Sequence, residues 1–278
     1  MTSHERLQVQ SELYGEDAFR RVEVTGNGNS LVLLKFATKT DEKNVRYDED
    51  GDIVIPRKQN LLLEFSETTT IDLVGLQLWR GAFLLSDFIL SEHSHLFENK
   101  VILELASGIG LTSIVAGMVG KRVISTDVNQ KDVLDLLSRN IERNNDIVKA
   151  QMTIEALNFY QTDWSVEMKC MLNETDIVIA ADVVYDDELT EAFVLCLTKI
   201  LLEPPQKIFF LALEKRYVFT LADLNSVPPC YDHFITFLHE TWKPSPMSNW
   251  RVEFVDTDFY QSFDYDRTEQ LVLLKIST

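Results

Sequence analysis

The chain has 278 residues, of which 45% are hydrophobic, and this composition is typical of a globular protein and excludes disorder along the whole length. Its 44 acidic residues outnumber its 26 lysines and arginines, so the formal net charge at pH 7 is -18. A charge of this sign repels nucleic acid and disfavours a surface that binds phosphates broadly. We expect either a basic protein partner or a charge that serves solubility alone.

Cysteine usage and apolar segments bear on where the protein works. Its three cysteines form no CxxC pair, which favours a reducing compartment and neither a disulfide framework nor a zinc site. Residues 1–17 carry no apolar core of the signal-peptide type, so we expect a protein that is not secreted. The apolar stretch Ile71–Leu90 contains Asp72, Arg80 and Asp87, charges that favour a half-buried helix over a membrane span.

The first quarter of the chain has the alternation that is typical of β-strands. Strand-like runs at Arg21–Val24 and Leu31–Phe36 flank a glycine-containing turn and predict a hairpin. An acidic turn, Asp48–Asp52, leads to a short run at Ile53–Ile55, and Leu61–Phe65 predicts a further strand. We therefore expect residues 1–75 to form a small N-terminal β subdomain.

The remainder of the chain, residues 76–278, alternates short apolar runs with helical patterns. A helix is expected between Leu76 and Ile89. After it the pattern predicts strands and helices in turn at Val101–Leu105, Leu111–Val119, Arg122–Thr126, Val133–Arg143, Met152–Leu157, Ile177–Ala181, Leu189–Leu202 and Ile208–Leu213. This order predicts βαβ units, and hence a doubly wound α/β fold with a mostly parallel sheet. The final runs, Arg251–Val255 and Gln270–Ile276, predict an antiparallel hairpin.

The most informative segment is the turn Ala106–Gly110, which follows the expected strand Val101–Leu105. Its small residues let a ligand approach the backbone, and the free N–H groups of the next helix can meet polar ligand atoms. Asp127 ends the next strand, where a carboxylate can accept both hydroxyls of an adenosine ribose. A tight turn with a helix-capping aspartate is the alternative, but the two features together favour a nucleotide-binding site.

Two cofactors are compatible with this turn. The segment Gly108–Ser113 approximates the GxGxxG pattern of a dinucleotide site, with Ser113 in place of the third glycine. Glu104 argues against that reading, because an acid at the strand end would repel a pyrophosphate. Its carboxylate can instead hydrogen-bond the amides of the glycine loop beside a zwitterionic amino acid that bears a sulfonium. The balance favours S-adenosylmethionine.

The segment Glu104–Gly110 resembles the first motif of class I, seven-strand S-adenosylmethionine-dependent methyltransferases, with Ala106 where that motif usually has its first glycine. The resemblance implies a Rossmann-like methyltransferase domain over residues 76–278, built on a seven-strand sheet. It also implies cofactor contacts from Trp79, Glu104, Ala106, Ser107, Gly108, Gly110, Asp127, Asn158, Phe159 and Ala181.

Two of these residues have a structural alternative. The amide oxygen of Asn158 can accept a hydrogen bond from the amine of adenine, and relatives often have an Asp-Trp pair where this chain has Asn158 and Phe159. A turn-forming asparagine is the alternative. Trp79 can wall the cofactor pocket, although its place on a helical apolar stripe favours a core residue.

The segment Asp182–Tyr185 follows the strand Ile177–Ala181, at the edge where open α/β sheets bind ligands. The carboxylate of Asp182 can pair with an ammonium, and the phenol of Tyr185 can add a hydrogen bond and an aromatic wall. The segment resembles the Asp/Glu-x-x-Tyr/Phe motif of the family 16 protein lysine methyltransferases, whereas methyltransferases of adenine bases have two prolines there. An acidic helix cap beside a packing tyrosine is the alternative.

From these residues and the resemblance we expect an in-line methyl transfer to a neutral lysine amine, without a metal, in which Asp182 and Tyr185 hold the acceptor. Glu214, at the end of the strand Ile208–Leu213, is either a further substrate contact or a surface acid. The resemblance implies a nucleic-acid-associated protein substrate and a nuclear location, and the net charge favours a basic substrate. We also expect a monomeric nuclear or cytoplasmic enzyme that binds neither nucleic acid nor membrane itself. An NAD-dependent oxidoreductase and a catalytically silent cofactor-binding module are the rival functions.

Overall fold

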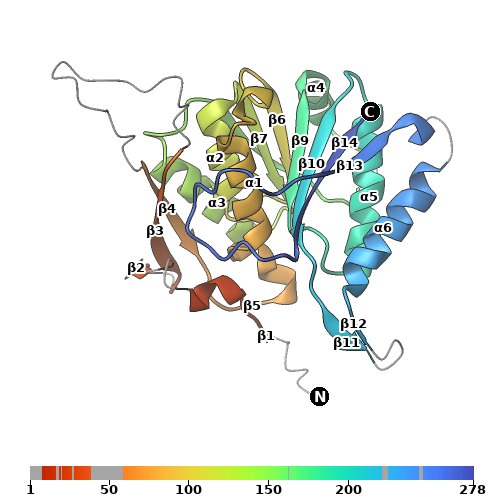
Figure 1. Cartoon of the computed structure of the whole chain (residues 1–278). Helices are drawn as coiled ribbons and strands as arrows, with labels where there is room; N and C mark the ends of the chain where they lie inside the picture. The colour runs from red at the N-terminus through yellow and green to blue at the C-terminus, as the bar shows by residue number, and fades with distance from the viewer. Residues whose placement is uncertain are drawn as a thin grey trace, which may run out of the picture.

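The computed structural model describes residues 8–16, 19, 21–26, 28–38, 59–161, 163–220, 225–243 and 247–278 (Figure 1). Its α-helices are α1 (Arg80–Leu90), α2 (Leu111–Val119), α3 (Lys131–Arg143), α4 (Val166–Glu174), α5 (Asp187–Leu202) and α6 (Pro229–Trp242). Short 3-10 helices are η1 (Glu12–Gly15), η3 (Ile71–Leu76), η4 (Ser94–Leu96) and η5 (Met247–Asn249). The strands are β1 (Gln8–Val9), β2 (Arg21–Val24), β3 (Ser30–Phe36), β4 (Gln59–Phe65), β5 (Thr69–Thr70), β6 (Val101–Leu105), β7 (Arg122–Asp127), β8 (Gln151–Ala156), β9 (Ile177–Ala181), β10 (Ile208–Glu214), β11 (Val218–Thr220), β12 (Asn225–Val227), β13 (Arg251–Val255) and β14 (Leu271–Ser277).

The central sheet has seven strands in the order β13-β14-β10-β9-β6-β7-β8. The strands from β10 to β8 pair in parallel, and β14 pairs antiparallel with both β10 and β13. The expected doubly wound, mostly parallel seven-strand sheet with an antiparallel C-terminal pair is therefore confirmed. The strand order reverses between β6 and β9, and this is where an open α/β sheet forms a crevice at its carboxyl edge.

Helices cover both faces of this sheet. Ile102 and Phe210 point into a hydrophobic cluster with side chains of α1, α2 and α3, whereas their neighbours Leu103 and Leu211 join a second cluster with α4, α5 and α6. A strand that is buried on both faces needs a continuous apolar sequence, because successive side chains alternate between the faces. This requirement explains why the strands stand out in the sequence as apolar runs.

Several helical boundaries differ from the expectation. The helix expected from Leu76 onward begins at Arg80, because η3 ends at Leu76 and the residues between are extended. The α4 and α6 helices and the β11–β12 hairpin were not predicted. The sequence predicts a connection between elements at Pro228–Pro229. In the structure Pro229 is instead the first residue of α6, a position at which the missing N–H of proline removes no helical hydrogen bond.

The segment Ile71–Leu90 is long and apolar enough by composition to cross a membrane, yet it is not one continuous helix. It consists of η3, an extended stretch and α1, and 78% of its most apolar window is buried inside the protein. Its apolar side chains belong to the core, with Phe83, Leu84 and Ile89 fully buried.

The N-terminal strands form a separate antiparallel sheet in the order β2-β3-β4, which confirms the predicted hairpin. The expected acidic turn Asp48–Asp52 and the run Ile53–Ile55 lie outside the described residues. Core side chains of β3 and β4 pack in the same cluster as α1, α2 and α3. The boundary between residues 75 and 76 stays a prediction.

Asn140 of α3 and Asn144, the C-cap residue of this helix, bind the backbone of β4. The Oδ1 atom of Asn140 accepts a hydrogen bond from the Glu64 amide at 2.8 Å, and its Nδ2 donates to the Glu64 carbonyl at 2.9 Å. Asn144 makes the equivalent pair with Leu62 at 2.9 and 2.8 Å. Asn140 also donates to the carbonyl of Ile109, next to the glycine turn. These bonds attach the N-terminal sheet to α3.

Residues 8–16 hold the stretch that leads into α1. The Gln77 side chain, 2% exposed, accepts from the Ser11 amide at 2.8 Å and donates to the Val9 carbonyl at 2.8 Å. The Tyr14 hydroxyl accepts from the amide of Leu78 at 2.8 Å. The buried Gln77 side chain and the Leu78 amide, which lie between η3 and α1, therefore find their partners in a segment more than 60 residues earlier in the chain.

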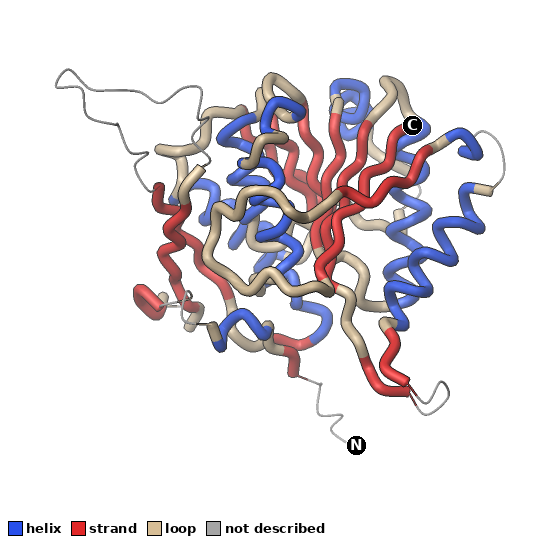
Figure 2. Tube along the Cα trace, viewed as in Figure 1, coloured by secondary structure: helices blue, strands red, loops and turns tan. Residues whose placement is uncertain are grey.

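The loop between β13 and β14, residues 256–270, runs across α1 (Figure 2). The fully buried Asp87 of α1 accepts from the amides of Ser262 and Phe263 at 2.8 and 3.1 Å and pairs with Arg267 at 2.5 Å. Burial raises the pKa of Asp87 to about 6, although the Arg267 guanidinium opposes this shift. The loop therefore fixes α1 from its outer side.

Replacing Asn140 tests the attachment of the N-terminal sheet. Asn140→Leu keeps a side chain of similar size but leaves the amide and carbonyl of Glu64 and the carbonyl of Ile109 without this partner. We expect the free energy of unfolding, measured by urea titration, to fall by about 2–4 kcal/mol. The control is Asn173→Leu on the exposed face of α4, for which a loss of similar size would refute the assigned role.

Candidate active site

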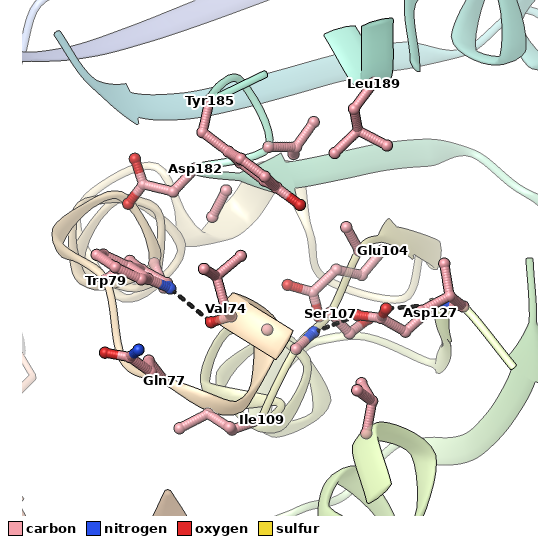
Figure 3. A pocket seen from close by; sticks show the side chains of 18 of the residues that line it. Val74, Gln77, Trp79, Glu104, Ser107, Ile109, Asp127, Asp182, Tyr185 and Leu189 are labelled. Carbon is pink, nitrogen blue, oxygen red and sulfur yellow. Dashed lines mark hydrogen bonds between the residues drawn. The ribbon is translucent and has the colours of Figure 1, made fainter. Parts of the chain in front are cut away.

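A cavity of about 350 Å³ lies at the carboxyl edge of the sheet, where β6, β7 and β9 end (Figure 3). The residues predicted from sequence that line it are Trp79, Glu104, Ala106, Ser107, Gly108, Asp127, Asn158, Phe159, Ala181, Asp182 and Tyr185. Gly110 and Glu214 are not among the lining residues. The structure thus brings together most of the candidate residues in one place, and their individual roles stay predictions.

The glycine turn owes its shape to three residues with positive φ. Ala106, Gly108 and Gly110 have φ values of 52°, 53° and 90°. A Cβ on Gly108 would lie 2.8 Å from the carbonyl oxygen of Gly75, so only glycine fits between the turn and η3. Ala106 adopts the left-handed conformation despite its Cβ, at a cost of about 1 kcal/mol, which explains the usual glycine at this place in the motif.

Gly110 serves packing rather than the cavity wall. It is the N-cap residue of α2, and a Cβ there would lie 2.5 Å from the Cδ1 atom of Leu137 in α3. The predicted cofactor contact of Gly110 therefore has no support in the lining of the cavity. The lack of a side chain at Gly110 instead leaves room for Leu137.

The carboxyl group of Glu104 is buried away from solvent. It is 2% exposed, and Ser113 donates a short hydrogen bond to its Oε2 atom. Ser125 in turn donates to the Ser113 hydroxyl at 2.6 Å. Burial raises the pKa of Glu104 to about 7, although the serine hydrogen bonds oppose this shift. Its carboxyl is therefore poised to ionise near neutral pH when a cation enters the cavity.

Asp127 is held by two backbone amides. Its Oδ2 atom accepts from Gly108 and its Oδ1 atom from Val128, both at 2.7 Å. Burial raises its pKa, while these amides lower it. One lone pair of each oxygen is engaged in this way, so the second remains for a hydroxyl of a ligand. The carboxylate thus joins the glycine turn to the end of β7 and still faces the cavity.

The side chain of Asn158 stabilises a turn, which was the alternative to adenine binding. Its Oδ1 atom accepts from the Tyr160 amide at 3.0 Å, while the residue as a whole lines the cavity. Phe159 also lines the cavity and packs its ring against Phe193 of α5, with 5.4 Å between the ring centroids. The adenine contact of Asn158 stays a prediction that uses the remaining lone pair of the same oxygen.

Asp182 and Tyr185 leave the end of β9 in different directions. The Tyr185 hydroxyl points into the cavity, whereas the Asp182 carboxylate is turned toward Trp79 and the start of α1 (Figure 3). Its Oδ2 atom accepts from the Gly81 amide at 2.6 Å and its Oδ1 atom from the Glu214 amide at 2.9 Å. Burial raises the pKa of Asp182 and that of Tyr185, the latter to about 12. The phenol therefore stays protonated and can donate a hydrogen bond.

The acids after Tyr185 behave as a helix cap. Asp186 accepts from the Leu189 amide at 2.9 Å through its side chain, and Asp187 and Glu188 form the acidic first turn of α5. Asp186 is therefore the N-cap residue of α5, and the two acids that follow it are favourable at a helix N-terminus. All three acids are exposed, and they form a negatively charged rim beside Tyr185.

Trp79 has the position in the cavity wall that was one of its two interpretations, whereas Glu214 lies outside the cavity lining. Trp79 precedes α1 as its N-cap residue, is half-buried, and donates from Nε1 to the Val74 carbonyl at 2.9 Å, so it lines the cavity instead of joining the helical core stripe. Glu214 pairs with the buried Arg80 at 3.0 Å. The side chain of Glu214 is thereby held away from the cavity, and its predicted substrate contact finds no support in the geometry.

Two residues near the cavity were missed by sequence reasoning. Gln130 lines it beside Asp127, and its buried Oε1 atom has no hydrogen-bond partner among the described residues. An acceptor in that position needs a donor from a ligand or water. Arg216 lies with its guanidinium carbon 4.6 Å from the centre of the Trp79 ring. The signal for Gln130 was its place three residues after Asp127, at the start of α3.

Comparisons with known proteins identify the class to which this fold and site belong. The sequence profile of a family described as lysine methyltransferase matches residues 57–225, so the chain belongs to the lysine methyltransferase family. It is an enzyme of this class, and its cofactor is S-adenosylmethionine.

Among its relatives, Methyltransferase-like protein 22 from Homo sapiens is 34% identical over 91% of this chain and 76% of that protein. The protein of the same name from Mus musculus is 33% identical over 77% of this chain and 58% of that protein. The human protein-lysine N-methyltransferase EEF2KMT is 34% identical over 44% of this chain and 40% of its own length. A solved structure of the N-methyltransferase NodS from Bradyrhizobium japonicum is 14% identical, with a TM-score of 0.44 over 72% of this chain and 85% of that chain.

The chemistry of the cavity fits S-adenosylmethionine. The close contact at Gly108 provides a backbone cradle, and the unpartnered oxygen of Gln130 provides an acceptor for an amine or hydroxyl. Asp127 has lone pairs for ribose hydroxyls, and Glu104 suits a ligand that carries an ammonium and a sulfonium. When bound, the cofactor supplies an electrophilic methyl carbon; the residues named here would hold its nucleoside and amino-acid parts.

Glu104 makes cofactor affinity depend on pH. Because its pKa lies at about 7, the carboxyl is mostly neutral at pH 6 and mostly ionised at pH 8, and only the ionised form attracts the ammonium of the ligand. We expect the dissociation constant of S-adenosylhomocysteine, measured by calorimetry, to rise about tenfold from pH 8 to pH 6. Glu104→Gln should bind more weakly with little pH dependence, and an unchanged pH dependence in this variant would contradict the assignment.

Proposed function

We propose that the chain is a protein-lysine N-methyltransferase that acts on a basic segment of its substrate. The observation that carries the proposal is the placement of Tyr185, whose protonated phenol points into the cofactor cavity from the strand end that bears Asp182. A lysine that enters there meets a phenol oxygen that can accept a hydrogen bond from its N–H groups, and an aromatic wall beside a carboxylate. Relatives with protein-lysine methyltransferase or protein-lysine N-methyltransferase in their names support this substrate class.

The residues of the chain would act by positioning. Methyl transfer needs a neutral amine aligned with the methyl carbon, and a fixed slot raises the rate by holding this geometry. Tyr185 would set the direction of the amine through its ring and hydroxyl. Asp182, anchored by two amides, would fix the slot and orient the ammonium before its proton leaves. Neither role requires a covalent intermediate.

Charge supports a basic substrate. The formal net charge of -18 is joined at the site by the exposed Asp186, Asp187 and Glu188, which follow Tyr185 directly. Such a rim raises the encounter rate with a cationic segment and repels nucleic acid. The three free cysteines support work in a reducing compartment such as the nucleus or the cytoplasm.

The rival functions are less well supported. A dinucleotide would bring its pyrophosphate close to the acid Glu104. Ser113, which occupies the position of the third glycine in the dinucleotide pattern, donates its hydrogen bond to this same acid. A silent binding module would not need a phenol that points into the cavity. Label transfer distinguishes both from a methyltransferase.

The direct test is methyl transfer in an extract. The enzyme is incubated with radiolabelled S-adenosylmethionine and protein from cells that lack it, and the label is mapped by mass spectrometry. We expect labelled lysine within a basic segment, and no label with Asp127→Ala, for which cofactor affinity should be weakened. Label on another residue type, or none with the wild type under conditions where it binds cofactor, would refute the proposal.

Tyr185→Phe separates transfer from cofactor binding. The change keeps the ring and removes the hydroxyl, and a hydrogen bond to a charged group is worth about 1.5–3 kcal/mol. We expect the single-turnover transfer rate to fall about tenfold to a hundredfold, with the dissociation constant of S-adenosylhomocysteine unchanged within about twofold. Tyr260→Phe, far along the chain in the β13–β14 loop, serves as the matched control. Equal losses of binding and transfer would assign Tyr185 to the cofactor instead.

A further inference from the structure

Arg216 places a positive charge at the mouth of the cavity. It follows β10, is exposed, and lies with its guanidinium carbon 4.6 Å from the ring centre of Trp79, a residue that lines the cavity. Its neighbour Lys215 is directed elsewhere, with its ammonium 4.5 Å from the ring centre of Tyr231 in α6. Of these two adjacent cations, only Arg216 is therefore stacked on the wall of the active site.

The other charged or titratable groups near this position come from four elements, β9, β10, α5 and α6. From the end of β9, the Asp182 carboxylate is held beside Trp79 by the Gly81 amide. From β10, Glu214 is paired with Arg80, which is buried and also binds Glu12 and Glu16. From the start of α5 come the exposed Asp186 and Asp187, and from α6 comes the Cys230 thiol, whose pKa is raised by burial and by these two acids and lowered by Arg216.

The positive charge of Arg216 acts on the Asp182 carboxylate. Burial is the main influence on the Asp182 pKa and raises it, and Arg216 is the largest influence in the opposite direction. This matters because a carboxylate alone stabilises the ammonium form of a bound lysine, which cannot attack. A guanidinium close to the same carboxylate offsets that effect. The cluster therefore contains both an anchor for the acceptor and a cation that disfavours its protonated form.

We propose that Arg216 is a positioning residue that lowers the pKa of the bound acceptor lysine and so increases the fraction of neutral amine at physiological pH. This inference rests on the proposed lysine methyltransferase function. The lysine proton passes to solvent before transfer. The nitrogen lone pair then forms the N–C bond, and the C–S bond breaks with its electron pair left on sulfur, which yields a methylated ammonium and a neutral thioether.

The test measures the pH dependence of single-turnover transfer. Protein from cells that lack the enzyme is the probe, and enzyme is added in excess until the rate stops increasing, so that the profile reports the bound lysine. Arg216→Met removes the charge but retains an apolar side chain over Trp79. We expect its rate to be about tenfold lower than wild type at pH 7, with the deficit shrinking as the pH rises toward 10.

Two further variants complete the design. Arg216→Lys retains a cation over the ring and should restore most of the rate at pH 7. Lys215→Met carries the same charge change next to Arg216, away from the site, and should leave the profile unchanged. A constant ratio of Arg216→Met to wild type at every pH would overturn the inference and leave the methyltransferase function intact. A wild type that labels no lysine at any pH would overturn both.

Discussion

The site depends on one carboxylate that joins three elements. Asp182, at the end of β9, binds the amide of Gly81 at the start of α1 and the amide of Glu214 at the end of β10. It adopts a φ of 50°, and a Cβ on Gly81 would lie 2.6 Å from its Oδ2 atom and 2.9 Å from the carbonyl oxygen of Ala212. A glycine and a strained aspartate thus allow helix and strands to meet closely, and Trp79 takes its place on the cavity wall as a result.

This junction is supported from outside by segments distant in sequence. Residues 8–16 provide hydrogen-bond partners for Gln77 and Leu78 and two carboxylates for Arg80, all just before or at the start of α1. This segment lies before the region 57–225 that matches the family profile. The 256–270 loop binds the far side of the same helix through Asp87 and Arg267. The wall of the cavity is therefore held by both ends of the chain, and its geometry is coupled to parts of the protein that contain none of the motif residues.

Local patterns predicted most of the fold because they are direct consequences of burial. Strands that are covered on both faces are mostly apolar, so β6, β9 and β10 were visible as apolar runs. The α6 helix was missed because Pro228 and Pro229 suggested a linker, whereas proline at a first helical position is compatible with a helix. Ala106 stands where the motif usually has a glycine, and its positive φ explains that usual glycine. The residue type alone does not reveal this backbone conformation.

The sequence by itself determined that an acid, a glycine turn and a second acid follow consecutive strands, and in a parallel sheet such strand ends share one edge. Only the tertiary structure decided how each side chain is used. Glu214 pairs with Arg80, 134 residues away, while Arg216 reaches the cavity mouth, and Gly110 accommodates Leu137. These outcomes depend on which charge or side chain a distant segment brings into contact, and that is set by packing between elements rather than by the local order of residues.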